Sequence, residues 1–470
     1  MAKIIYAGSN NTSYQQADAD LEHLAELPVG AKQVRRLCKR IGAERVAQRD
    51  AAAVAYQALP LIQRKAAPAQ VTPPQVVAVG VDGGRLQILE RHPQQTAPPP
   101  SATATPPTAL AGAAVADTPV LVPAAAGVAA TVVSSPLSAA ADPAGVVPTV
   151  SAALPLPAAD LASDDDEAER GQHWREDKIG LLLTLVSTEA KADPCPTIPG
   201  HFLNPVRMSR LVRELKKRAP PQAEAAKEAD DPLAADEALA ANTAQWEPPK
   251  VQGKRVVASR RPWEQFGPLV ATAAWEQGFF AASRKAFLGD GADNNWTLHR
   301  NYFSSFVAIL DFIHALSYVF AAACAGRSFA TGWEVYQRWI QWVWSGAVNR
   351  VLEELTQRQA ELGEPAGDEA AGSPRSVVAR ARTYLSNNQE RMRYAEYRRL
   401  GLPITTSHVE SMVKQMNYRV KGTEKFWNEE GAEEILQLRA DYLSDGGVMD
   451  TFWKHREATE SGQNRYRTAV

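Results

Sequence analysis

The stretch QVVAVGVDGGRLQILE, residues 75–90, determines how the rest of the chain can fold. Valines alternate with small residues from Val77 to Val81, which is the two-residue period of a strand. The glycine pair after Asp82 predicts a tight turn, and alternating apolar residues resume from Leu86 to Ile88. The stretch therefore predicts a strand, a turn and a second strand, with Asp82 at the end of the first strand.

Further strands are predicted along the chain, and helical patterns lie between them. The run from Ile179 to Val186 is continuously apolar, as in a buried strand. KAFLGD from Lys285 and FVAIL from Phe306 are short strands, and a helical pattern spans Trp263 to Ala282. Strands that carry acids and are interleaved with helices indicate an α/β fold class.

Composition excludes several classes of protein. A chain of 470 residues can hold two or three domains, and its formal net charge of −2 does not by itself announce a nucleic-acid partner. Its cysteines, Cys38, Cys195 and Cys324, form no CxxC pair. They therefore indicate neither a disulfide framework nor a cysteine zinc site, and they fit a reducing compartment.

No segment has the pattern of a secretory signal or a membrane span. The N-terminal residues lack a basic region followed by an apolar stretch. The most apolar long run begins at Phe306 and is interrupted by Asp311 and His314. We therefore expect a cytoplasmic protein with no membrane partner.

The N-terminal residues predict a helical pair. Two short helices are expected between Ala17 and Gly42, broken at Pro28–Gly30. The second carries a cluster of basic residues, so the pair resembles a helix-turn-helix DNA-binding segment. An ordinary helical hairpin with a solvated basic face explains the pattern equally well, and both interpretations stay open.

Composition also divides the chain into segments. An Ala/Pro-rich stretch with almost no charge cannot form a packed core, so we expect a long disordered insert. A second polar stretch, 220–249, is expected to be a surface excursion. The predicted segments are a helical N-terminus (1–60), the first strands (70–92), the insert (93–165), the rest of the sheet (166–314), a helical insertion (315–402) and the C-terminal helices (403–457).

Four acidic residues stand where a strand ends or a helix begins: Asp82, Asp290, Asp311 and Glu410. Acids at strand ends project into one crevice of an α/β sheet. Carboxylate oxygens are the ligands that Mg²⁺ prefers, and two such ions can clamp the attacking and leaving oxygens of phosphoryl transfer. The set therefore predicts a two-metal site.

Each acid also has a purely structural explanation. Asp82 precedes Gly-Gly, as in hairpin turns, and Asp293 in GDGAD can cap the following helix, which makes it a rival to Asp290. Asp311 can be an N-cap, and the segment Ser407–Glu410 matches a capping box. The four acids together indicate a metal site more strongly than any one of them does alone.

Four motifs, taken in chain order, resemble those of a known family. VDGG from Val81, GDGAD from Gly289, DFIH from Asp311 and LPITTSHVES from Leu402 are similar to the signature of bacterial insertion-sequence transposases. The resemblance is to the Mutator-like branch of the DDE superfamily. It covers most of the chain outside the insert, and the tail from Leu402 to Gly447 is its most specific part.

This resemblance implies an RNase-H-like catalytic core with a mixed sheet and an all-helical insertion. It implies that Asp82, Asp290 and Glu410 hold two Mg²⁺ or Mn²⁺ ions. Asp311 and His314 would form an accessory D-x-x-H element in which His314 orients the scissile phosphate or a neighbouring group. The implied activity is cleavage at transposon ends and strand transfer into target DNA, by a homo-oligomer associated with the bacterial nucleoid.

Local clusters of basic residues provide positive charge, although the net charge of the chain is close to zero. Phosphate contacts of this kind give affinity without sequence readout. A solvated helix face explains any one cluster equally well. The residues predicted to contact DNA are Arg35, Arg36, Lys39, Arg40, Lys414, Arg419, Lys421 and Lys425.

The helical insertion contains four tryptophans at helical spacing, from Trp333 to Trp344. They are expected either to form core or to stack on an unpaired base. Two other functions remain open: a non-catalytic DNA-binding protein derived from a transposase, and a structure-specific nuclease with the same core.

Overall fold

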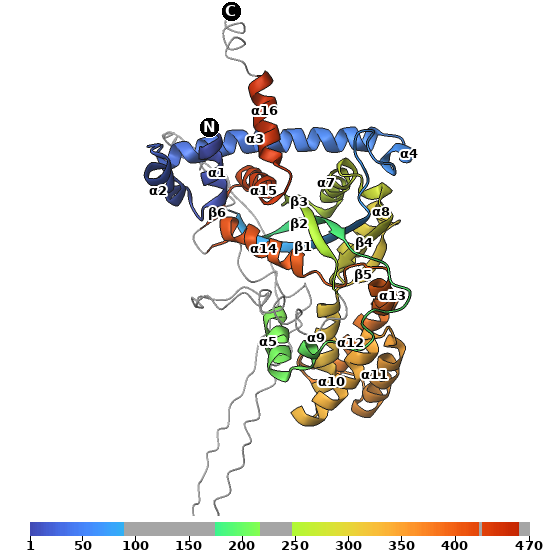
Figure 1. Cartoon of the computed structure of the whole chain (residues 1–470). Coiled ribbons are helices and arrows are strands. Elements are labelled where there is room, and N and C mark those ends of the chain that lie inside the picture. Colours follow the sequence, from blue (N-terminus) through green and yellow to red (C-terminus); the bar gives the residue numbers. More distant parts are fainter. Residues whose placement is uncertain (89–173, 217–246, 423–424, 460–470) are drawn as a thin grey trace, which may run out of the picture. The chain divides into compact units, whose positions relative to one another are not determined.

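A mixed sheet forms the centre of the molecule, with strand order β3-β2-β1-β4-β5 (Figure 1). The computed structural model describes residues 1–88, 174–216, 247–422 and 425–459. The β1–β2 and β2–β3 pairs are antiparallel, whereas β1–β4 and β4–β5 are parallel. The strands are β1 (Val76–Ile88), β2 (Trp174–Val186), β3 (Lys250–Ser259), β4 (Arg284–Gly289), β5 (Val307–Leu310) and a short β6 (Phe426–Trp427) beside the end of β1.

Strand β1 is continuous, so the predicted turn after Asp82 is wrong. Its pairing with β2 runs without interruption from Val76, opposite Leu185, to Gln87, opposite Trp174. The long partner strand supplies backbone hydrogen bonds to both halves of β1, and this pairing outweighs the local turn signal of the glycines. Asp82 therefore lies within the strand and not at its end.

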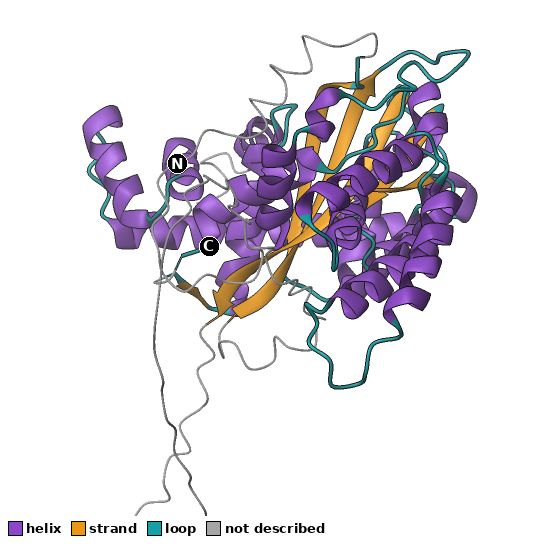
Figure 2. Cartoon of the chain, turned by 90° about the horizontal axis from the view of Figure 1, so that it is seen from below, coloured by secondary structure: helices purple, strands orange, loops and turns teal. Residues whose placement is uncertain are grey.

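The other predicted strands are confirmed. The apolar run from Ile179 to Val186 forms most of β2, KAFLG forms most of β4, and β5 falls within FVAIL. Among the described residues the fold is therefore a mixed α/β fold with helices on both faces of the sheet (Figure 2).

The N-terminal helices differ from the prediction in length. Helix α2 (Tyr14–Ala25) matches the first predicted helix, but α3 (Ala31–Ala58) continues sixteen residues past Gly42. Besides its contacts with the other N-terminal helices, it packs against α7 (Trp263–Glu276) and α15 (Glu429–Leu443), and these contacts with the rest of the fold stabilise the longer helix. The remaining N-terminal helices are α1 (Ala2–Asn10) and α4 (Leu61–Arg64).

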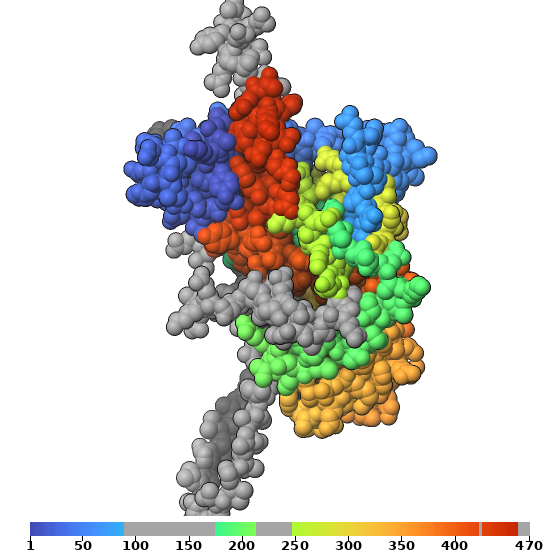
Figure 3. Space-filling model, in the orientation of Figure 1, coloured from blue at the N-terminus to red at the C-terminus, as the bar shows by residue number. Residues whose placement is uncertain are grey.

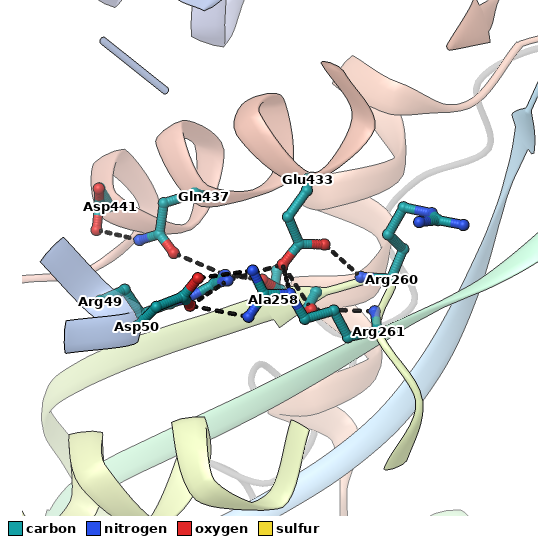
Figure 4. A network of polar contacts seen from close by, with 9 residues as sticks. Arg49, Asp50, Ala258, Arg260, Arg261, Glu433, Gln437 and Asp441 are labelled. Atoms are coloured by element: carbon teal, nitrogen blue, oxygen red, sulfur yellow. Dashed lines mark hydrogen bonds and ion pairs between the residues drawn. The ribbon is translucent and has the colours of Figure 1, made fainter. Parts of the chain in front are cut away.

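A partly buried polar network fixes α3 against α15 and the end of β3 (Figure 4). Its centre is Glu433, which accepts hydrogen bonds from Ser259 Oγ at 2.6 Å, Arg49 at 2.9 Å and the backbone N–H of Arg260 at 2.9 Å. Asp50 accepts from Arg261 at 2.6 Å. Because buried charges must be fully paired, this network admits few other positions for α3.

The predicted helical insertion is helical in the structure. Its core includes Trp339 and Trp344, each 1% exposed or less, which agrees with the packing interpretation of the tryptophans. The helices of this region are α9 (Phe312–Cys324), α10 (Phe329–Trp344), α11 (Val348–Leu362), α12 (Pro374–Asn388) and α13 (Tyr394–Arg399), with the short 3₁₀ helix η4 (Gln389–Arg391).

Opposite faces of the sheet are covered by different helices. Gly180 of β2 faces Val270 of α7, whereas Gly80 of β1 faces Val409 of α14 (Ser407–Val420). The remaining elements are α5 (Pro205–Lys216), α8 (Asp293–Tyr302), and the 3₁₀ helices η2 (Gly200–Leu203) and η3 (Phe279–Ala281).

The two ends of the described chain lie together. Helix α16 (Val448–Thr459) packs beside the N-terminal helices (Figure 3), where Phe452 and Met449 share a small apolar cluster with Ile41. Arg456 pairs with Glu44 of α3 at 3.0 Å.

Two predicted segments cannot be compared with the structure. The Ala/Pro-rich insert (93–165) and most of the surface excursion (220–249) lie outside the described residues. Within the described ranges, no helix is both long and apolar enough to cross a membrane.

Candidate active site

Three of the predicted acids follow one row across the sheet. Strands β1 and β4 pair with Gly80 opposite Leu288, and continuing this register aligns Asp82 with Asp290. In the same way, β4 and β5 pair with Gly289 opposite Leu310, which aligns Asp290 with Asp311. Neighbouring strands are about 4.8 Å apart, so the row brings the three acids to adjacent strands.

Helix α14 brings Glu410 to the same face. A Cβ atom at Gly80 would overlap the Val409 side chain, so the absence of a side chain lets α14 lie directly against β1. Asp82 is two residues after Gly80, and alternate residues of a strand point to the same face. Asp82 and the first turn of α14, with Glu410 after Val409, therefore share one face of the sheet.

Helix α14 has its N-cap one residue earlier than the predicted capping box requires. Helix α14 has Thr406 at its N-cap, with no side-chain hydrogen bond from that residue, and Ser407 is already inside the helix. The N-cap of α14 is therefore Thr406 and not the predicted Ser407.

Glu410 lies closest to the D-x-x-H element. One ligand atom from each of Asp311, His314 and Glu410 lies within 4.8 Å of the others. Asp82 and Asp290 stand outside this group, and no second group of three such residues is that close in the part of the chain that the structure describes. The structure thus brings together one member of the predicted triad and both accessory residues.

Asp311 is fully buried and its oxygens are already engaged. One oxygen accepts from the backbone N–H of Thr406 at 2.7 Å, and the other accepts from the N–H and Nδ1 of His314 at 2.9 and 2.6 Å. Burial would raise the pKa of Asp311, but the hydrogen bonds and charge of His314 and the Thr406 N–H outweigh it and lower the pKa. The N-cap interpretation of Asp311 is confirmed.

Asp290 is oriented by buried neighbours. Its Oδ1 atom accepts from Asn295 Nδ2 at 2.8 Å and from the backbone N–H of Ala292 at 3.0 Å. Asn295 is only 3% exposed. Both bonds fall on Oδ1, so they fix the orientation of the carboxylate through that oxygen and leave Oδ2 outside this pair of hydrogen bonds. Asp293, the rival, is exposed in the first turn of α8.

These donors fit a divalent cation of the Mg²⁺ or Mn²⁺ type. Within the close group, Glu410 carries carboxylate oxygens and His314 an imidazole nitrogen, a combination that suits Mn²⁺ better than Mg²⁺. Asp82 and Asp290 carry carboxylate oxygens outside this group. Asp311 accepts three hydrogen bonds, so its chemistry is that of a support for His314 and not of a ligand.

The predicted DNA contacts divide into exposed and structural residues. The five exposed ones are Arg35, Arg36, Lys39, Arg40 and Lys414. Arg419 is 2% exposed, donates to the backbone oxygen of Gly8 at 2.9 Å, and lies 4.5 Å from the centre of the Tyr14 ring. A guanidinium enclosed in this way cannot reach a phosphate, so the prediction that Arg419 contacts DNA is wrong.

Two further predicted contacts are half-buried. Lys425 donates to the backbone oxygens of Tyr418 and Arg419 at the end of α14. Lys421 lies 5.6 Å from the centre of the Trp174 ring. Both lysines have interactions within the chain that compete with DNA contact.

Sequence patterns missed one buried acid on this face. Asp177 of β2 is opposite Gly84 of β1, has no exposed surface, and has no hydrogen-bond partner for either oxygen among the described residues. Burial raises its pKa to about 7. Because it lies among other charged residues in REDK, the sequence gives no signal of its burial.

Comparisons with known proteins find no matching family model and no matching curated protein.

Proposed function

We propose that this chain is a DDE-type DNA transposase with an RNase-H-like core. The observation that carries the proposal is the row of Asp82, Asp290 and Asp311 on adjacent strands, with Glu410 brought to the same face by α14. The mixed sheet supports it, as do an aspartate on the first strand and a glutamate that follows a helical region.

In this proposal Asp82, Asp290 and Glu410 hold two Mg²⁺ or Mn²⁺ ions. Bound ions of this kind lower the pKa of a nucleophile and neutralise charge that develops on phosphate oxygens. Asn295 keeps Asp290 in its orientation through Oδ1, and Asp311 keeps His314 in its orientation through Nδ1. His314 then orients a phosphate oxygen of the DNA or a neighbouring group.

The proposed substrate is DNA at the ends of a mobile element, and then target DNA. Exposed Lys414 is one helical turn after Glu410, so it is suited to contact the backbone beside the site. The exposed basic residues of α3 are proposed to bind DNA further away. A homo-oligomer is the proposed active form.

The test is DNA cutting by variants of the full chain with Mg²⁺ or Mn²⁺. We expect Asp82→Asn, Asp290→Asn and Glu410→Gln each to abolish cutting while DNA binding persists. The matched control is Asp293→Asn, which removes a nearby exposed carboxylate and should retain cutting.

Cutting that survives in any of the first three variants would refute the proposed site. A joining assay with pre-cut ends then separates the two enzyme classes, since a structure-specific nuclease would cut DNA without joining it. DNA binding without cutting in the wild type would instead support the non-catalytic alternative.

A further inference from the structure

The helical region contacts the ends of the two parallel strands through tyrosine hydroxyls. Tyr384 of α12 donates to the backbone oxygen of Asp290 at 2.5 Å, directly after β4. Tyr394 of α13 donates to the backbone oxygen of Leu310 at 3.0 Å, at the end of β5. Each strand end that leads into a candidate-site aspartate is therefore held by a hydroxyl from the helical region.

Tyr384 also encloses the turn after Asp290. Gly291 has φ of +105°, and a Cβ there would lie 2.5 Å from Cε2 of the Tyr384 ring. The ring of Tyr318 in α9 also stacks on that of Tyr384, with ring centres 3.8 Å apart. The turn has no room to move toward α12, and only glycine fits both its backbone conformation and this ring.

Two separate anchors thus fix Asp290. Asn295 holds the side-chain atom Oδ1, and Tyr384 holds the backbone oxygen of the same residue. Burial, followed by the charge of Asp290, raises the pKa of Tyr384 well above its usual value, so its hydroxyl keeps the proton that it donates.

We infer that Tyr384 is a positioning residue for Asp290: its hydroxyl, delivered by the helical region, fixes the direction in which the Asp290 carboxylate presents its ligand oxygen. This inference rests on the proposed function, because it assigns Asp290 to a divalent cation. The helical region then contributes to metal binding without supplying a ligand. Groups that orient metal ligands typically change metal affinity by roughly 10- to 100-fold when removed.

The experiment uses the full chain and Mn²⁺ alone, with free Mn²⁺ measured by electron paramagnetic resonance. Tyr384→Phe keeps the ring, the stack on Tyr318 and the packing on Gly291, and removes only the hydroxyl. We expect its Mn²⁺ dissociation constant to rise by roughly tenfold. Asp290→Asn gives the size of the loss when the carboxylate itself is removed.

The matched control is Tyr336→Phe. Tyr336 of α10 is fully buried, and its hydroxyl donates to the backbone oxygen of Phe202 at 3.0 Å, among residues outside the candidate site. Both variants lose one tyrosine–carbonyl bond, so both should lower the melting temperature. Only Tyr384→Phe should weaken Mn²⁺ binding.

Equal Mn²⁺ affinity in Tyr384→Phe and wild type would overturn the positioning role and leave the transposase proposal intact. A wild type that binds Mn²⁺ through Asp290 but cuts no DNA would remove the transposase function, and the Mn²⁺ constants would still decide the role of Tyr384. A wild type that binds no Mn²⁺ would overturn both.

Discussion

Asp311 accepts a hydrogen bond from Nδ1 of His314 at 2.6 Å, and the same carboxylate caps the helix on which His314 lies. Because a carboxylate oxygen only accepts, Nδ1 of His314 carries the proton of this bond, and in the neutral form of the imidazole Nε2 would be the nitrogen that binds a cation. Asp311 thus supports His314, and His314 and Glu410 are the other two members of the close group.

Replacing His314 by two different amides should separate its two nitrogens. Asparagine can keep a donor near the Nδ1 position, whereas glutamine can place a polar group near Nε2. We expect His314→Asn to retain most of the thermal stability and to lose DNA cutting by roughly 100-fold or more. His314→Gln should lose more stability and keep more cutting. The melting temperature and the cutting rate of each variant test this, and the reverse order would contradict the assignment.

Gly80 is expected to control the distance between α14 and β1. Gly80→Ala places a methyl group against Val409, whose branched side chain has little freedom to turn away. We expect a loss of about 1–3 kcal/mol in the free energy of unfolding, together with weaker cutting as Glu410 is displaced.

The control for Gly80→Ala is the double variant Gly80→Ala/Val409→Ala, because the second substitution removes the methyl groups that overlap with the new side chain. Denaturant unfolding of the single and double variants measures the coupling between the two positions. If the effects of the two substitutions are additive, so that Val409→Ala recovers none of the stability lost in Gly80→Ala, the overlap with Val409 is not the cause of that loss.

The sequence predicts the structure correctly where the signal for an element is local. The apolar run from Ile179 to Val186 predicts β2, and the acids at the ends of β4 and β5 predict a shared edge, because strand ends converge in an α/β sheet. It was misleading at Gly83 and Gly84, where a local turn signal is outweighed by pairing with β2, a strand far away in the sequence.

The supporting residues of the site could not be predicted. Tyr384 is 94 residues after Asp290, and its contact depends on how several helices pack between them. Arg419 likewise has the sequence context of an exposed DNA contact, and it is enclosed by Gly8 and Tyr14 of the N-terminal region together with Trp427. Both cases depend on long-range packing, which leaves no periodic pattern in the sequence.

Asp177 should make stability depend on pH. Its folded pKa of about 7 is above the ordinary value of 3.8, with burial as the largest cause and the charge of Glu176 adding to it, while its own backbone N–H and the charges of Lys178 and Lys421 oppose it. The folded state therefore holds the proton more tightly than the unfolded state. The contribution of Asp177 to the free energy of unfolding is therefore fully present below about pH 4 and is lost as the pH rises toward 7.

The variant Asp177→Asn stays neutral at every pH, so it should resemble the wild type at pH 4 and exceed its stability at pH 8. The rise in pKa from 3.8 to about 7 sets an upper limit of about 4 kcal/mol on the difference in the free energy of unfolding between the two proteins at pH 8. For comparison, Glu176→Gln removes the neighbouring, half-exposed carboxylate that pairs with Lys178 and adds to the raised pKa, so it should reduce the pH dependence without abolishing it. Melting temperatures across this pH range decide the matter, and a variant that follows the wild type at every pH would show that Asp177 is not protonated in the fold.

Lys414 and Arg419 are on the same helix and should behave in opposite ways. Lys414 is exposed, so Lys414→Gln should weaken DNA binding and lower the salt dependence of the binding constant by roughly one phosphate contact, with little change in stability. Arg419→Gln removes a buried hydrogen bond and the contacts with Tyr14 and Trp427, so it should lower the free energy of unfolding by about 2–4 kcal/mol. Binding titrations at several salt concentrations, carried out where both variants are folded, test the contrast. A reduced salt slope in Arg419→Gln but not in Lys414→Gln would reverse the assignment of these two cations.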